Sequence, residues 1–193
     1  MPLLVGGVSG AFHLRRVPAA SPDLPERTFM PLRLSKIAML LGLALFAFLV
    51  TLNNIVDYGS NFAFVQHVLS MDTTFEGNAL MGRAITTEWM WHAGYWLIIA
   101  GEGLTALLLG IGAIRLLMAL RAPVRDFHAA KSWAVLGATT GFLVWFVGFM
   151  AIGAEWFLMW QSDIWNGQQP AFRFYITILA VIIFVMQPDE DAI

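Results

Sequence analysis

Cysteine is absent from this sequence of 193 residues. Its absence excludes disulfide bonds, thiolate catalysis, zinc sites with thiolate ligands and iron–sulfur clusters, all of which need cysteine sulfur. The sequence also contains no phosphate-binding loop, no serine-centred nucleophile motif and no cluster of metal ligands. We therefore expect no enzymatic activity and predict no metal site and no cofactor.

Charged residues are scarce as well: they make up 12% of the sequence, against 59% hydrophobic residues. A soluble domain carries roughly 25% charged residues. Four stretches contain no charge at all, namely 37–56, 103–114, 132–154 and 174–188. A helix needs about 20 mostly apolar residues to cross a membrane, and somewhat fewer where flanking groups reach the headgroups. The chain is therefore predicted to be an integral membrane protein.

Four segments are predicted to cross the membrane as helices, so the expected fold is an all-α, four-helix transmembrane bundle. The last span is short, and Pro170 suits its first turn, where a missing N–H costs nothing. The spans belong to one transmembrane domain over residues 30–187, with approximate bounds at 34–52, 89–114, 132–158 and 170–187.

Basic residues are divided unequally between the two ends of this bundle. Nine of the eleven Lys and Arg residues precede the first span or flank the link between the second and third. Only Arg83 and Arg173 belong to the other end, where several acidic residues accompany them. Because basic residues favour the cytoplasmic side, both termini are expected in the cytoplasm, with the protein in a bacterial inner membrane.

The two ends of the chain differ from the spans in composition. Residues 1–29 hold four Pro among small and polar residues and lack the continuous apolar core of a signal peptide. They are expected to form a disordered cytoplasmic tail, unless Met30 is the true start of the protein. Residues 188–193 are expected to form an acidic, solvated cytoplasmic tail.

The segment 53–88, which joins the first two spans, mixes polar with apolar residues. In its stretch NNIVDYGSNFAFVQHVLSMDTTF, apolar residues recur at helical spacing from Asn61 onward. About ten residues are too few to span a membrane, so an amphipathic helix on the outer surface is predicted. We expect a non-helical turn over 53–59 before it and a second short helix over 78–85 after it. The segment is interpreted as an outer cap, and the question of whether it also binds something stays open.

Several long motifs carry a resemblance to a known family. They are the 53–75 stretch, the GRAI that follows it, WQSDIWNGQQPAFRF at 160–174 and QPDED at 187–191. From about Met30 onward the chain resembles a bacterial family of predicted small integral membrane proteins of unknown function. The resemblance implies a four-span inner-membrane protein with cytoplasmic termini. It implies no reaction, ligand or site residue.

Glu102 lies in the middle of an apolar span, in the stretch WLIIAGEGLTALLLG. An acid at that depth costs roughly 2.5–3.5 kcal/mol on insertion scales, so Glu102 is expected to face the bundle interior with a partner, or to be protonated. Tyr95 and His92 precede it on the same helix face. These three residues form a candidate intramembrane polar site that could bind a headgroup or pass protons. The structural alternative is a neutral Glu102 bonded to a neighbouring helix.

A polar and aromatic surface, the outer crown, is predicted where the loops meet on the outer face. Tryptophan favours the headgroup level, so an aromatic belt is the simplest interpretation. The density of Trp, Gln and Asn exceeds what a belt needs, and the surface would suit a partner protein, a quinone head or a lipid headgroup. The crown comprises Asn53, Asn54, Asp57, Tyr58, His67, Arg83, Trp160, Trp165, Asn166, Gln168 and Arg173.

Two further candidates lie near the outer surface. Glu155 ranks second as a buried acid, and at the interface it would pair with Arg173 or Arg83, or be solvated. His67 and His92 could serve as axial ligands of a b-type haem, with interfacial hydrogen bonding as the alternative.

Three hypotheses for the function follow. The leading one is a non-catalytic accessory or assembly subunit of a larger membrane complex, because the chain is small and its spans hold little reactive chemistry. The second is a redox anchor that binds haem or a quinone through Glu102, His92 and Tyr95, with His67 as a further candidate. The third is an oligomeric transporter or channel subunit, although we find no internal repeat. The expected partners are the lipid bilayer and other membrane-protein subunits, and no nucleic acid.

Overall fold

The computed structural model describes residues 29–189, and the expectations for residues 1–28 and 190–193 lie outside that range. The described residues form helices and no β-strand, which confirms the all-α prediction. Four helical stretches are long and apolar enough to cross a membrane, also as predicted. They cover Met30–Val56, Glu88–Met118, Val124–Trp156 and Gln168–Met186.

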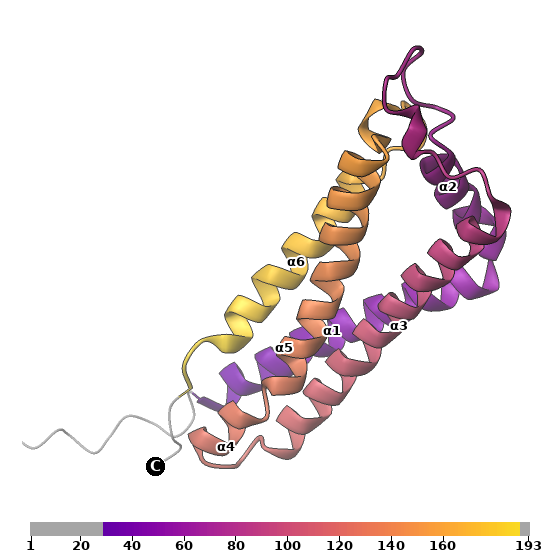
Figure 1. The fold of residues 1–193 in the computed structure, drawn as a ribbon. Helices are drawn as coiled ribbons and strands as arrows, with labels where there is room; N and C mark the ends of the chain where they lie inside the picture. The colour runs from indigo at the N-terminus through magenta and orange to yellow at the C-terminus, as the bar shows by residue number, and fades with distance from the viewer. Residues whose placement is uncertain (1–28, 190–193) are drawn as a thin grey trace, which may run out of the picture.

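The long helices form two arms that meet at one end and diverge toward the other (Figure 1). One arm pairs α1 (Phe29–Val56) with α3 (Glu88–Met118). The other pairs α5 (Ser132–Phe142) and its continuation η2 (Leu143–Trp156) with α6 (Gln168–Met186). Because α3 packs closely against α5 and only marginally against η2, the arms separate along η2.

Short helices lie at the two ends of this pair of arms. α2 (Tyr58–Ser70) lies at the open end, where it contacts α1 and α3 and packs its Val68 against η2 (Figure 1). α4 (Val124–Ala129) lies where the arms meet. We refer to these as the α2 end and the α4 end. The single turns η1 (Met81–Arg83) and η3 (Met159–Gln161) complete the α2 end.

The two arms touch through small residues. A Cβ added at Gly112 of α3 would lie 2.6 Å from the backbone nitrogen of Ala134 on α5. A Cβ at Gly137 of α5 would lie 2.7 Å from the backbone nitrogen of Leu109. Small residues let helix backbones approach closely, which is a common basis of packing between membrane helices.

The core and the surface follow the pattern of a membrane protein. Leu40, Ala113 and Val185 are fully buried where the arms meet. Elsewhere on the long helices, large apolar side chains such as Leu107 and Ile183 are exposed. Lipid tails solvate such side chains as well as a protein core does, so the long helices are apolar on both faces.

The cap differs from the sequence prediction in two respects. α1 continues through Asn53 and Asn54 to Val56, and only Asp57 separates it from α2, so the predicted non-helical turn over 53–59 is wrong. The predicted second helix over 78–85 is limited to the turn η1. The predicted short helix on this surface is present as α2.

The α4 end is closed by the residues that follow α6. Asp189 accepts hydrogen bonds from Lys36 of α1, at 2.8 Å, and from Lys131, which precedes α5. Both ammonium groups also donate to the carbonyl oxygen of Gln187. Lys36 is 0% and Lys131 is 1% exposed, and the Asp189 side chain is 1% exposed. The expectation of a solvated acidic tail is therefore wrong at Asp189, because two buried cations hold its carboxylate.

Candidate functional site

The side chain of Asn54 connects α1, α2 and α3. Its Nδ2 donates to Oε2 of Glu102 at 2.7 Å, and its Oδ1 accepts from Nδ2 of Asn61 at 2.7 Å. Its carbonyl oxygen accepts a hydrogen bond from the hydroxyl of Tyr95 at 3.3 Å. Asn54, Tyr95 and Glu102 are at most 5% exposed. Tyr95 and Glu102 therefore meet at Asn54, which was predicted to belong to the outer crown.

Glu102 faces the interior and has a partner, as its cost in a membrane required. Within the described residues, Asn54 provides its only side-chain hydrogen bond, through Oε2. No hydrogen bond to Oε1 is found among the described residues, and Glu102 lines the adjacent cavity. A carboxyl with one oxygen held and one oxygen free can accept a hydrogen bond from a ligand, or form an ion pair with a positively charged one.

His92, the third residue of the predicted intramembrane polar site, lies nearer the surface. The Tyr58 hydroxyl and Nδ1 of His92 are 2.8 Å apart, and the ring of Phe62 stacks on the imidazole at 4.1 Å between centroids. Partial burial raises the pKa of Tyr58. His92 thus joins the aromatic group of α2, whereas Tyr95 and Glu102 join Asn54.

A cavity of about 330 Å³ lies beside Glu102; we call it the polar cavity. Residues of α1, α2, α3, η2 and the start of α6 line it, it is partly open, and its size falls at the lower end of the range for ligand pockets. Glu102, Asn54 and Asn61 supply its principal polar groups. Aromatic rings form much of the remaining wall: they belong to Phe64, Tyr95, Trp145, Phe149 and Phe174.

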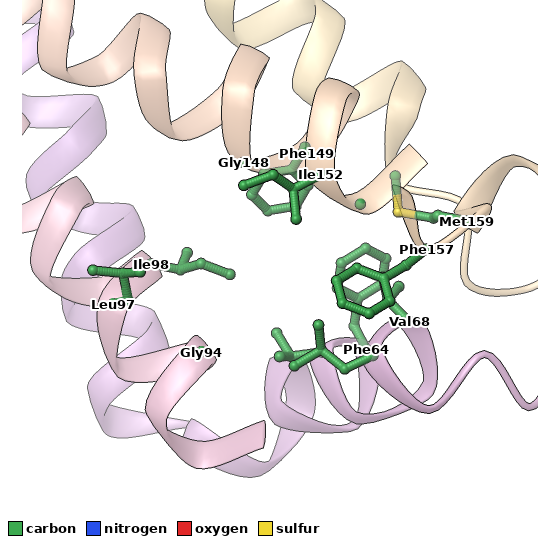
Figure 2. A pocket seen from close by; sticks show the side chains of 13 residues that line it. Phe64, Val68, Gly94, Leu97, Ile98, Gly148, Phe149, Ile152, Phe157 and Met159 are labelled. Atoms are coloured by element: carbon green, nitrogen blue, oxygen red, sulfur yellow. The ribbon is translucent and has the colours of Figure 1, made fainter. Parts of the chain in front are cut away.

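A second cavity of about 160 Å³, the apolar cavity, lies between α2, α3 and η2. Figure 2 shows side chains from these elements, such as Phe64, Ile98 and Ile152, directed toward a common space. No charged side chain is among the described residues that line it. Phe64, Val65, Ile98 and Phe149 line both cavities, so the two spaces share a wall of apolar side chains.

The segment η2 supplies one side of both cavities. Its hydrogen bonds follow the wider π-helical pattern, which ends with the Phe157 N–H donating to the carbonyl oxygen of Ile152, five residues earlier, at 3.0 Å. Gly148 and Gly153 leave room on its inner face, and a Cβ on Gly148 would meet nothing closer than 4.0 Å. π-Helical turns are rare and are frequently found at functional sites.

The residues that shape these cavities were not among the predicted site residues. Asn61 begins the amphipathic pattern of α2, and Phe64, Trp145 and Phe149 occupy apolar positions of helices. Their spacing fits any buried helix face, so no local signal separates a cavity wall from a packed core.

The other crown residues engage local partners instead of the cavity. His67 stacks on Trp165 at 4.7 Å and contacts the Asp72 carboxylate at 2.8 Å. The Asp57 carboxylate accepts from Ser60, and Trp160 meets Phe75 edge-on. The backbone N–H of Gln168 donates to Oδ1 of Asn166, and Asn53 and Arg173 are exposed. Of the predicted crown, only Asn54 lines the polar cavity.

Glu155 is exposed, which fits the solvated alternative and contradicts its ranking as a buried acid. Among the ion pairs of the described residues, none joins Glu155 to Arg83 or Arg173. The guanidinium of Arg83 instead donates to the carbonyl oxygen of Trp156 and lies over its ring, 4.5 Å from the centroid.

Comparison with known proteins agrees with this architecture. Residues 32–188 match the model of a family described as predicted small integral membrane protein (DUF2165). Searches of curated proteins and of solved structures found no match.

Proposed function

The chain belongs to this family of small integral membrane proteins, and from that premise we propose that it binds a small membrane-soluble molecule between its arms. The observation that carries the proposal is Glu102, a carboxyl that is 2% exposed and faces a cavity with one oxygen unbonded. A buried acid in a membrane is costly and usually serves binding or transport.

The two cavities together suit an amphiphile. The polar cavity offers Glu102 and two Asn side chains for a headgroup, and the apolar cavity beyond the wall of Phe64 and Phe149 offers room for a hydrocarbon part. The rings of these two residues stack at 5.9 Å and line both spaces. A quinone belongs to the same broad class of molecules. The b-type haem with His67 and His92 stays a prediction, which an optical spectrum of the purified protein tests.

The test is a native mass spectrum of the protein purified from its own membrane. The variant Gly148→Leu places a side chain in the apolar cavity, and Gly110→Leu is its control, because open space surrounds Gly110. We expect a bound small molecule in the wild-type protein and in the control, and its loss in Gly148→Leu. A bare wild-type mass, or detergent and bulk phospholipid only, would contradict the proposal.

A second candidate function is the accessory subunit. Phe75 and Ile164 lie in connecting segments of the α2 end, outside the spanning helices, and are 59% and 77% exposed. Exposed apolar side chains of this kind mark interaction sites when they form a patch. Stable co-purification with other membrane proteins would support this function, and isolation as a lone monomer would oppose it. The transporter hypothesis stays a prediction.

We also propose that the α4 end faces the cytoplasm of a bacterial inner membrane. Arg33, Lys36, Arg115, Arg121, Arg125 and Lys131 belong to this end, whereas Arg83 and Arg173 belong to the α2 end. This distribution follows the preference of basic residues for the cytoplasmic side.

A further inference from the structure

The wall of the polar cavity combines one acid with many aromatic rings. Glu102 is its only carboxyl, and no Lys, Arg or His is among the described residues that line it. Two of these rings, those of Trp145 and Phe174, pack edge-on with their centroids 5.4 Å apart. With Glu102 ionised, a site of this composition carries a negative charge that no basic group among the described lining residues offsets.

This composition discriminates between headgroups by their charge. An ammonium group would pair with the Glu102 carboxylate and be attracted to the ring faces, an interaction that reaches ~2 kcal/mol when desolvated. An anionic head would be repelled by Glu102, and the repulsion is stronger in a cavity than in water because the dielectric constant is lower. A neutral head would gain from neither interaction.

We infer, on the basis of the proposed function, that the ligand is an amine-bearing amphiphile. Its ammonium head occupies the polar cavity against Oε1 of Glu102 and the surrounding rings, and its hydrocarbon chain extends past Phe64 and Phe149 into the apolar cavity. Asn54 positions the carboxyl through the 2.7 Å hydrogen bond to Oε2, which leaves Oε1 for the ligand.

The aromatic wall and the free oxygen go beyond what a structural role for Glu102 requires. A carboxyl that only joined two helices would be satisfied by Asn54 and would need no adjoining space. Here the same carboxyl borders about 330 Å³ that the side chains leave unfilled. A cationic ligand would act as the counter-ion that a buried carboxylate needs in a membrane.

The experiment compares three probes with the same alkyl chain and different heads: octyltrimethylammonium, octanol and octyl sulfate. Binding to the purified protein is measured by isothermal titration calorimetry in an uncharged maltoside detergent. We expect the ammonium probe to bind about ten-fold more tightly than octanol, which corresponds to ~1.4 kcal/mol, and octyl sulfate to bind most weakly. In Glu102→Gln, the ammonium probe should lose this advantage.

Glu155→Gln is the matched control, because this substitution removes the same charge at an exposed position. Selectivity for the ammonium probe should persist in this variant. Equal loss in both variants, or full selectivity in Glu102→Gln, would overturn the inference. If Glu102→Gln does not fold, the order of the three probes on the wild-type protein decides: equal affinities, or a preference for octyl sulfate, would overturn it.

The outcomes also separate this inference from the proposed function. If octanol binds as tightly as the ammonium probe and Gly148→Leu weakens both, the protein binds amphiphiles without regard to charge. The proposed function then stands and the inference about the amine fails. If no probe binds and the native mass spectrum shows no ligand, both fail.

Discussion

The side chain of Asn54 donates a 2.7 Å hydrogen bond to Glu102, a residue 48 positions further along the chain. The bond joins α1 to α3 and holds one oxygen of Glu102, which is the only acid among the described residues that line the polar cavity. Because Asn54 also accepts from Asn61 of α2, the same residue links the cap to the buried carboxyl. The cap and the cavity are therefore one structural unit.

We expect Asn54→Ala to destabilise the protein by about 1–3 kcal/mol, because it leaves Glu102 and Asn61 without a partner. Asn53→Ala is the control, since Asn53 is the exposed neighbour on the same helix. Thermal unfolding in detergent, followed by tryptophan fluorescence, measures both. Equal melting temperatures for the two variants would show that the hydrogen bonds of Asn54 contribute nothing to stability.

The sequence predicted the spans and the short helix of the cap because both depend on local patterns. Charge-free runs specify the spans, and apolar residues at helical spacing specify α2. Asn54 was misplaced because an Asn after an apolar run usually signals a helix end. Here the helix continues to Val56, since Glu102 and Asn61 satisfy the Asn54 side chain. Contacts across 48 positions cannot be read from local composition.

The same limit explains the error at Asp189. A terminal segment rich in acids is normally solvated, and nothing next to it in the sequence indicates a buried partner. The two lysines that hold Asp189 lie 153 and 58 positions earlier, and they come together only when α1 and α5 both pack against α3 and α6.

The contact between the arms predicts a strong difference between two glycines of α3. Gly112→Ala should cost about 1–3 kcal/mol, because its Cβ would lie 2.6 Å from the backbone of α5 and would push the helices apart. Gly110→Ala should be neutral or slightly stabilising, because its Cβ meets nothing within 4 Å and Ala favours the helix. Thermal unfolding of both variants checks this. Similar destabilisation in both would mean that the close approach of α3 and α5 is not important for stability.

The proposed orientation can be measured directly because the sequence contains no cysteine. A single cysteine at Glu76, an exposed residue of the α2 end, should react with a membrane-impermeant maleimide in intact spheroplasts. A cysteine at Arg121, an exposed residue of the α4 end, should react only after permeabilisation. The unsubstituted protein supplies the background. The reverse pattern of labelling would place the α4 end outside the cytoplasm.

The ion pairs of Asp189 with Lys36 and Lys131 at the α4 end predict that the stability of the protein depends on pH. Burial alone would raise the pKa of Asp189, but the hydrogen bonds from Lys131 and Lys36 outweigh it and hold that pKa below its usual value. The carboxylate therefore stabilises the folded protein above the usual Asp pKa of about 3.9, and this stabilisation is lost as the pH falls through the lower value in the folded state.

At neutral pH, Asp189→Asn should cost about 3–5 kcal/mol, because it leaves two buried ammonium groups without their counter-ion. Asp163→Asn, at an exposed position, is the control and should change little. The melting temperatures of wild type and Asp189→Asn, measured from neutral pH downward, should converge once the wild-type carboxylate becomes protonated. A constant gap across this range would show that Asp189 acts through its shape and hydrogen bonds, and not through its charge.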